Sequence, residues 1–312
     1  MKQLVKIWVL VFAMVMGGAL PQQVTGDNTV TNQWCAQAKS KKKSKKNKKQ
    51  GKKDKKKSKK SNKSNIASPL VNLPTIGQSA TATKTAPHKA LMAVGTPKGL
   101  SNQVLNYKAI RVNYNPTFRI PNCVAYELTA TMVDMSDAPG HESRKSYNYA
   151  RDNSVKTCPE NWEYRGSGYS RGHMAPAMDM RWDKTTMAQC FYMTNMCPQD
   201  TKLNNDHWRV LEEKVHRWAK RDKRLMVYTG PIMGKNPKMI GKDKQNIAVP
   251  DAFFKVIYAP EQGRAIAFIY DNRPCPGGIS KYAVTVAEVE RRTGLTFPSA
   301  IPKRQCNIDD WE

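Results

Sequence analysis

The chain has 312 residues and carries 52 Lys and Arg against 25 Asp and Glu, a formal net charge of +27. Its hydrophobic fraction of 39% is low for a chain that is globular throughout, and it indicates a folded part joined to a substantial part without a core. The charge excludes an acidic surface that recruits basic partners. It favours a polyanion as the partner, such as nucleic acid, anionic lipid or an acidic polysaccharide.

The first 20 residues are predicted to be a secretory signal peptide. Lys2 and Lys6 precede a ten-residue apolar run at 7–16, and small residues follow at 17–19. This order is typical of an export signal, and the run is shorter than the about 20 apolar residues that cross a membrane. We therefore expect cleavage near Ala19 and a secreted, periplasmic or cell-surface protein.

A short flank at 21–38 leads into a lysine-rich tract. Residues 39–63 contain sixteen Lys and a single acidic residue. Because like charges repel and nothing there can be buried, we expect 39–65 to be disordered. Residues 66–105, rich in Ser, Thr, Ala and Pro, are interpreted as a linker. The tract is either a solvated spacer or a sequence-independent electrostatic contact to phosphate or to a cell surface.

Residues 106–312 form the predicted folded domain, which is long enough for one good core and remains basic. Apolar runs typical of strands lie at 123–133, 224–230, 253–258 and 265–270, and apolar residues at helical spacing lie at 204–220 and 286–293. The last two strands flank a short turn and predict a hairpin. Strands mixed with segregated helices predict the α+β class.

Six of the seven cysteines lie in this domain, and the seventh, Cys35, lies in the flank. Six cysteines in an exported domain allow up to three disulfides, whose pairing the sequence leaves open. No C-x-x-C spacing occurs, which disfavours a zinc site. The six are Cys123, Cys158, Cys190, Cys197, Cys275 and Cys306.

A glycine-rich stretch at 164–177 places His173 two residues after Arg171. Glycine lets the backbone approach a ligand closely, and arginine presents a fixed, charged fork that suits phosphate. Histidine can act as a base near neutral pH. Together these residues could activate a water against a phosphodiester. By itself the pattern is equally compatible with a structural histidine, which is the more common role of a lone histidine.

A second cluster of polar residues opens the helix predicted at 204–220. Asn204 and Glu212 are about two turns apart and lie on broadly similar faces. With Asp206 and His207 they offer oxygen and imidazole ligands, and oxygen donors that leave room for waters suit Mg²⁺. The alternative for Asn204 is an N-cap, a position that asparagine favours.

In these motifs the chain resembles the DNA/RNA non-specific endonuclease family, whose members have a ββα-metal active site. Three ordered motifs carry the resemblance, which spans about residues 107–300. They are Ser-Arg-Gly-His-Met-Ala-Pro at 170–176, Thr-Asn-Met-Cys-Pro-Gln at 194–199, and Leu-Asn followed by Trp and Leu-Glu between 203 and 212. The resemblance implies a central antiparallel sheet with helices packed on it. It also implies an endonuclease that hydrolyses DNA and RNA with little sequence specificity and leaves 5′-phosphate ends.

The resemblance also implies a role for each matching residue. His173 matches the general base that takes a proton from the attacking water. Asn204 matches the single protein ligand of Mg²⁺, for which Mn²⁺ is expected to substitute, and Glu212 matches an acid that orients the metal-bound waters. Arg171 matches a residue that supports the phosphate or the shape of the site, and Asn195 a polar residue beside the histidine.

Two points of the resemblance are less direct. An upstream arginine of the family contacts the transition state, and Arg144 is the first candidate for it here, with Arg151 the second. The family has Asp where this chain has Ser170. If that Asp takes part in catalysis, its loss weakens the enzyme, and Asp179 is a candidate to compensate. If the Asp is structural, catalysis is unaffected. In the alternative function, the site has decayed at Ser170 and the tract at 39–63 binds polyanions without catalysis.

Overall fold

The computed structural model describes residues 88–242 and 246–312. The predicted signal peptide, flank, lysine-rich tract and most of the linker lie outside the described residues. The folded part begins earlier than the expected boundary at 106, with α1 (His88–Leu91) and β1 (Gln103–Asn106). Leu91 and Met92 are buried, and the Leu91 carbonyl accepts a hydrogen bond from the Tyr228 hydroxyl. Two buried apolar side chains therefore attach this segment to the core.

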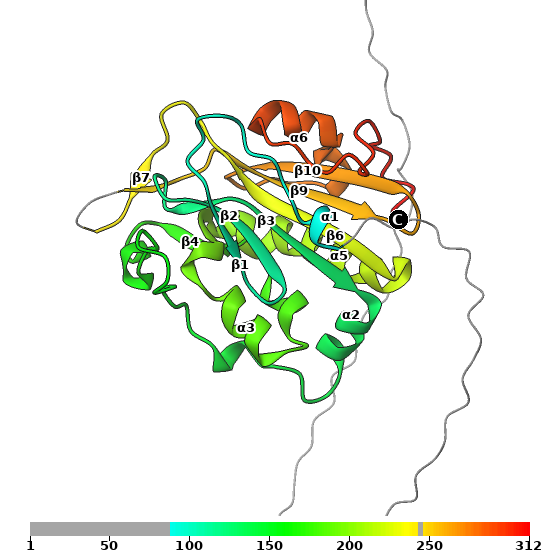
Figure 1. Cartoon of the computed structure of the whole chain (residues 1–312), viewed down its shortest axis with the longest axis horizontal. Coiled ribbons are helices and arrows are strands. Elements are labelled where there is room, and N and C mark those ends of the chain that lie inside the picture. The colour runs from blue at the N-terminus through cyan, green and yellow to red at the C-terminus, as the bar shows by residue number, and fades with distance from the viewer. Residues whose placement is uncertain (1–87, 243–245) are drawn as a thin grey trace, which may run out of the picture. The chain divides into compact units, whose positions relative to one another are not determined.

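A seven-stranded antiparallel sheet forms the centre of the fold (Figure 1), as predicted. Its strands, in spatial order, are β1, β2 (Ile110–Asn115), β3 (Ile120–Thr129), β6 (Arg224–Ile232), β9 (Ala252–Ala259), β10 (Arg264–Asp271) and β11 (Ala283–Val284). The expected hairpin is β9 and β10, which pair from Ala252 with Asp271 to Ala259 with Arg264. The four strand-like runs of the sequence are thus neighbours in this sheet, at β3, β6, β9 and β10.

The third strand ends earlier than its apolar run. The run at 123–133 predicts a strand throughout, but β3 stops at Thr129 and α2 (Ala130–Asp137) follows. The Thr129 side chain accepts a hydrogen bond from the Met132 amide at 3.2 Å, which caps the new helix. A favourable N-cap thus starts a helix within the apolar run.

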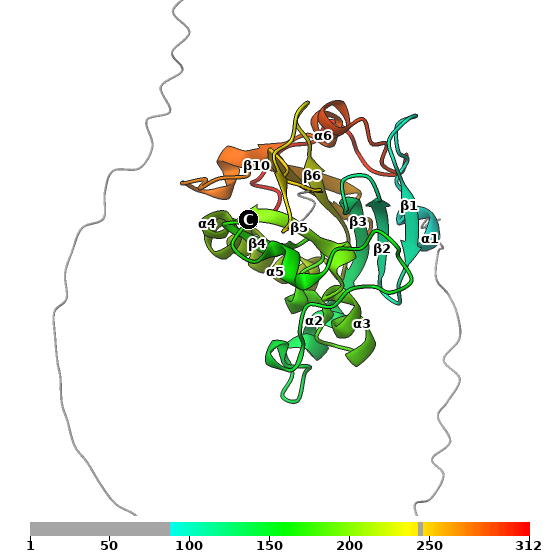
Figure 2. The same cartoon turned by 90° about the vertical axis from the view of Figure 1, so that its left-hand side faces the viewer.

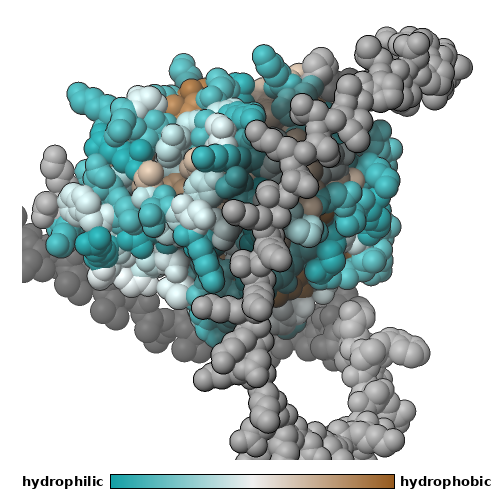
Figure 3. Space-filling view, turned by 90° about the horizontal axis from the view of Figure 1, so that it is seen from below, coloured by the Kyte–Doolittle hydropathy of each residue, from teal (hydrophilic) through white to brown (hydrophobic). Residues whose placement is uncertain are grey.

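Helices cover both faces of the sheet, and the two faces carry separate cores (Figures 1 and 2). Successive residues of a strand point to opposite faces, so Val227 joins one core while Met226 and Tyr228 join the other. One core includes residues from α3 (Lys184–Cys190) and α5 (Arg209–Asp222), and the other includes residues from α6 (Val286–Thr293). Seen from below, the outer surface is mostly hydrophilic (Figure 3).

The sixth helix matches its sequence prediction in position and in its ends. The Thr285 side chain accepts a hydrogen bond from the Glu288 amide at 3.1 Å, and Gly294, with φ of +71°, ends the helix in the left-handed conformation. None of the helices that the structure describes has the length and apolar character to span a membrane.

A small two-stranded sheet and the helix after it form a ββα unit beside the main sheet (Figure 2). Strands β4 (Tyr169–His173) and β5 (Met196–Asp200) pair antiparallel, and α4 (Thr201–Leu203), the π-helical turn η5 (Asn204–Trp208) and α5 follow directly. The helix predicted at 204–220 therefore spans 201–222. The remaining elements are β7 (Met239–Ile240), β8 (Ile247–Ala248) and the 3-10 turns η1 (Arg144–Ser146), η2 (Asn161–Tyr164), η3 (Ala177–Met180), η4 (Met193–Asn195) and η6 (Ile279–Tyr282).

The expected disulfides are not formed among the described residues. All six cysteines of the domain are free, and five of them are buried. Cys123 belongs to the core on one face of the sheet, whereas Cys158, Cys190, Cys197 and Cys275 belong to the core on the other face. The thiols therefore serve as small apolar side chains, a common role for free cysteine in a core.

Candidate active site

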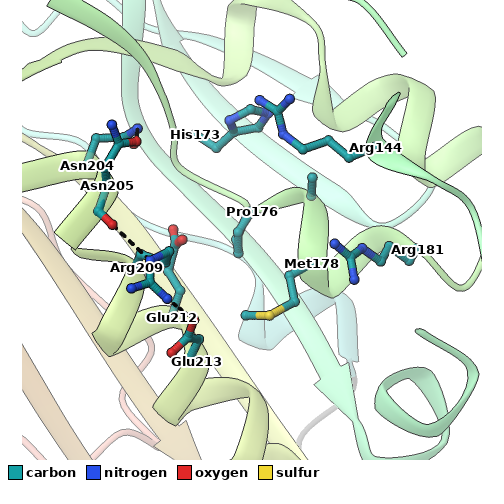
Figure 4. A pocket seen from close by; sticks show the side chains of 11 residues that line it. Arg144, His173, Pro176, Met178, Arg181, Asn204, Asn205, Arg209, Glu212 and Glu213 are labelled. Carbon is teal, nitrogen blue, oxygen red and sulfur yellow. Dashed lines mark hydrogen bonds and ion pairs between the residues drawn. The ribbon is translucent and has the colours of Figure 1, made fainter. Parts of the chain in front are cut away.

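The ββα unit borders a polar cavity of about 400 Å³ (Figure 4). Four of the predicted site residues, on η1, β4, η5 and α5, line it together. The lining consists of Arg144, His173, Pro176, Ala177, Met178, Arg181, Asn204, Asn205, Arg209, Glu212 and Glu213. Segments 60 residues apart in sequence thus meet in one site, as the ordered motifs led us to expect.

The imidazole of His173 lies in an aromatic surrounding at the end of β4. Its ring is 5.0 Å from the centre of the Phe191 ring and 5.6 Å from that of Tyr149. Burial, together with the charge of Arg144, lowers the pKa of His173 to about 3. The ring is therefore neutral at physiological pH, and its buried Nε2 atom has no hydrogen-bond partner within the described residues. A neutral imidazole with an unused nitrogen can act as a proton acceptor.

Glycine is required at position 172 because β4 lies directly against β5 there. A Cβ atom on Gly172 would collide with the fully buried side chain of Gln199, with 2.7 Å to its Cβ and 2.9 Å to its Cδ. Real Cβ atoms essentially never make contacts below 3.0 Å. The glycine therefore lets the strand that carries His173 pack closely on β5.

The buried amide of Asn195 holds the turn that follows His173. Its Oδ1 accepts a hydrogen bond from the Ala175 amide at 2.9 Å, and its Nδ2 donates to the carbonyls of Ala175 at 3.0 Å and Cys190 at 2.8 Å. The backbone of the same residue accepts from Met174 at 3.0 Å. Asn195 does not line the cavity. It acts on the site by fixing the backbone after β4, a supporting place like the one that the motif suggests.

Asn204 lies inside a helical segment and not at its N-cap. The N-cap is Asp200, whose side chain accepts hydrogen bonds from the amides of Lys202 and Leu203, both at 2.9 Å. Asn204 has helical dihedral angles and starts the π-turn, a local distortion that is frequent at functional sites. Its Nδ2 donates to Asn205 at 3.2 Å. Its Oδ1 accepts no hydrogen bond from the described residues, so this oxygen is free for a ligand.

Glu212 faces the same cavity from the first turn of α5 (Figure 4). Burial raises the pKa of its carboxyl to about 7, and the ammonium of Lys255 opposes that rise. Lys255 is itself fully buried, donates to Thr229 Oγ1 at 2.9 Å and lies 4.7 Å from the centre of the Trp208 ring. Lys255 was not expected as a neighbour of the site, although a lysine within the apolar run 253–258 is an unusual residue for a buried strand.

Ser170, the departure from the family pattern, lies away from His173. Its hydroxyl is 3.0 Å from Thr201 Oγ1, at the start of the helical segment. Asp179 does not bond His173 either. Its carboxylate accepts a hydrogen bond from Tyr126 and pairs with His216 Nδ1, both at 2.8 Å. The geometry therefore favours the reading in which this departure leaves the base undisturbed, and it gives Asp179 no direct part in compensation.

The predicted arginines occupy different places. Arg144 lines the cavity and donates to the Tyr149 hydroxyl at 3.1 Å. Arg171 does not line it. Its guanidinium lies between Tyr149 and Tyr164, at 5.4 and 5.5 Å from the ring centres, and donates to the Asn161 carbonyl at 2.6 Å. Of the two roles expected for Arg171, support of the phosphate or of the shape of the site, this geometry favours the second, because packing between two rings holds the guanidinium outside the cavity lining.

Two cavity-lining arginines were missed by the motif reading. Arg181 follows η3 directly, and Arg209 begins α5, donates to the Asn205 carbonyl at 2.8 Å and pairs with Glu213. With Arg144 they place three cations around one polar cavity. No local pattern marks these residues, because only the tertiary fold brings them to the cavity.

The donors in the cavity fit a hydrated divalent cation. No group of three His, Cys, Asp or Glu that could hold a metal occurs in the part of the chain that the structure describes. The cavity instead offers the free amide oxygen of Asn204 and the carboxylate of Glu212. Mg²⁺ keeps several waters and takes few protein oxygens, so this donor set suits it.

Comparisons with known proteins agree with this geometry. The family model for DNA/RNA non-specific endonuclease matches residues 87–304. The mitochondrial nuclease EXOG of Danio rerio is 30% identical over 258 residues, 75% of this chain and 73% of that protein. The mitochondrial endonuclease G of Homo sapiens is 31% identical over 173 residues, 51% of this chain and 58% of the human protein. A chain in a crystal structure of the EndoG/EndoGI complex aligns with a TM-score of 0.59 and 29% identity, over 64% of this chain and 87% of that chain.

Proposed function

Because the chain belongs to the DNA/RNA non-specific endonuclease family and is a nuclease, we propose that it is a Mg²⁺-dependent enzyme of low sequence specificity. Its substrates are DNA and RNA, and Mn²⁺ substitutes for Mg²⁺. The observation that carries the proposal is the neutral imidazole of His173 at a cavity that is also lined by Asn204 and three arginines.

In the proposed reaction, His173 accepts a proton from a water as that water attacks the phosphorus atom. The bond between phosphorus and the 3′ oxygen breaks and that oxygen takes a proton from solvent water, so the products are a 5′-phosphate and a 3′-hydroxyl end. Arg144 binds the phosphate and offsets the negative charge that develops on it. Contacts to phosphate carry no base information, which accounts for a broad substrate range.

Asn204 and Glu212 are the residues that would hold the Mg²⁺, Asn204 as direct ligand and Glu212 through waters. A bound Mg²⁺ stabilises the charge of the transition state and of the departing oxygen. Asn195 keeps the turn after His173 in place, and Arg171 fixes the Tyr149 ring that the imidazole packs against. These residues position the base without touching the substrate.

The test is cleavage of plasmid DNA and of RNA by the full chain and by His173→Ala, each with Mg²⁺ and with EDTA. We expect metal-dependent loss of both substrates with the parent and none with the variant. His141→Ala, which changes an exposed histidine outside the cavity, is the matched control and should retain parent activity. Cleavage by His173→Ala at the parent rate would refute the assignment of the base.

We further propose that the protein is exported, on the strength of the apolar run and flanking lysines of residues 1–20. The names of the relatives place them in mitochondria, so the two locations are alternatives for this chain. Fractionation of cells that express the full chain, with sequencing of the mature N-terminus, distinguishes them. An N-terminus near residue 20 on protein from outside the cytoplasm supports export, and recovery from mitochondria would overturn it.

A further inference from the structure

A second cavity, of about 420 Å³, lies outside the active site. The turn after β2, the loop at 151–160 and η2 form its walls. Its lining consists of Pro116, Thr117, Arg119, Arg151, Lys156, Thr157, Glu160, Trp162, Glu163 and Asn246. No residue of the catalytic cavity lines it, and none of the three sequence motifs contributes to it.

The chemistry of this cavity is aromatic and cationic. Trp162 is 40% exposed, which is unusual for so large an apolar side chain. Both carboxylates are already paired, Glu163 with Arg119 at 2.6 Å and Glu160 with Arg151 at 3.2 Å. Lys156 is exposed and has no ion pair within the described residues. The same cavity is therefore lined by a partly exposed indole and by a lysine without an ion pair among the described residues.

The walls are held rigid by hydrogen bonds that do not involve the Trp162 ring. A capping box fixes η2, in which the Glu160 amide donates to Glu163 Oε1 at 2.7 Å. Arg119 also donates from Nε to the Thr157 carbonyl at 2.9 Å. The exposed ring is thus presented by a fixed turn and loses little conformational freedom when a ligand stacks on it.

A short chain of contacts joins this cavity to the catalytic base. Asn161, next to Trp162, accepts a hydrogen bond from Arg171 at 2.6 Å. Arg171 lies 5.4 Å from the centre of the Tyr149 ring, and that ring is 5.6 Å from the ring of His173. Only Arg171 and Tyr149 therefore stand between the turn that carries Trp162 and the imidazole of His173.

We propose that this cavity is a binding site for one nucleotide of the substrate strand, away from the phosphodiester that is cleaved. The base stacks on Trp162 and the adjoining phosphate contacts Lys156. An aromatic platform beside a cation binds single-stranded nucleic acid without regard to sequence, because every base has a π-face. The inference rests on the proposed function, since it assigns the site to the nuclease substrate.

The first test measures binding without cleavage. Fluorescence anisotropy with a fluorescein-labelled oligothymidylate is recorded for the full chain carrying His173→Ala, alone and combined with Trp162→Ala. Loss of one stacked base weakens binding about 5- to 140-fold, whereas Trp162→Phe keeps a ring and should stay near the parent. Val104→Ala, at another exposed apolar residue, is the control. Lys156→Ala should reduce the slope of log K against log salt by about 1.

The second test compares substrate lengths in the otherwise wild-type enzyme. Trp162→Ala should raise KM for a long single strand and leave cleavage of a dinucleotide unchanged, because a dinucleotide cannot occupy both cavities. Thermal unfolding checks that the variant is folded. If the wild type cleaves nothing, the proposed function fails. If the wild type cleaves but Trp162→Ala binds and cleaves the long strand like the parent, this inference alone is overturned.

Discussion

Adding one methyl group at Gly172 tests how closely the position of His173 depends on the β4–β5 contact. In Gly172→Ala the new Cβ lies 2.7 Å from Gln199 Cβ, and ordinary contact begins at 3.4 Å. The two strands must therefore separate by about 0.7 Å. Gln199 is fully buried and cannot swing into solvent, so the strain is shared by β4 and the core beneath it.

The expected cost follows from overpacking of a close-packed interior, which is about 1–3 kcal/mol. At about 2–4 °C for each kcal/mol in a domain of this size, the midpoint of thermal unfolding should fall by about 2–12 °C. His173 is the next residue, and a catalytic group misplaced by about 1 Å can cost on the order of 100-fold in rate. We therefore expect kcat to fall by up to about 100-fold, whereas the midpoint of thermal unfolding falls only by the few degrees given above.

The assays are thermal unfolding and steady-state cleavage of one oligonucleotide at saturating Mg²⁺. Gly278→Ala is the matched control, because its φ is −71° and a Cβ there meets its nearest atom, Ser280 Oγ, at 3.6 Å. The control should match or slightly exceed the parent stability. If Gly172→Ala keeps both the unfolding midpoint and the kcat of the parent, the reasoning that this glycine is required for close packing is refuted.

Three further predictions test other parts of the site. Asn195→Ala should lower the free energy of unfolding in urea by at least about 2 kcal/mol, since it leaves buried backbone groups unpaired; a change below about 0.5 kcal/mol would contradict the assigned hydrogen bonds. Activity between pH 5 and 9 should rise near pH 7 as Glu212 ionises, because burial raises the pKa of Glu212 to about 7 and lowers that of His173 to about 3. If the pH–activity profile of Glu212→Gln still rises near pH 6.5, the titration belongs to His173 instead. Deletion of residues 39–63 should weaken nucleic-acid binding and flatten its salt dependence while kcat at saturating substrate is kept, and an unchanged salt slope would show that this tract does not touch the substrate.

The chemistry of the site could be predicted from the sequence where the residue type and its spacing suffice. His173, Asn204 and Glu212 belong to motifs whose order matches the family, and the fold brings all three to one cavity. Arg144 was a weak prediction of the same kind. It lines the cavity, whereas the second candidate, Arg151, pairs with Glu160 elsewhere.

The points that stayed open in the sequence have a common physical origin, because each depended on where a side chain points. The N-cap alternative for Asn204 is excluded only by the observed structure, in which Asp200 takes that place. Arg171 and Arg181 look alike in sequence, yet two tyrosine rings hold Arg171 outside the cavity that Arg181 lines. Cysteine count suggested disulfides, but Cys123 lies in the core on the opposite face of the sheet from most of the others.

Lys255 lies in a run that the sequence marks as a strand, and its charge gives that run a meaning beyond the strand itself. A fully buried ammonium is costly unless counter-charges and hydrogen bonds offset its lost hydration. Here Thr229 accepts its hydrogen bond, the Trp208 ring faces it, and the charges of Glu212 and Asp179 favour its protonated form, although burial still lowers its pKa. A lysine in the middle of an apolar strand therefore implied buried carboxylates nearby, before any motif was considered. Through Trp208 and Glu212 this residue ties the central sheet to the helix that carries Asn204, so the rigidity of the cavity comes from the core beneath it as well as from the ββα unit.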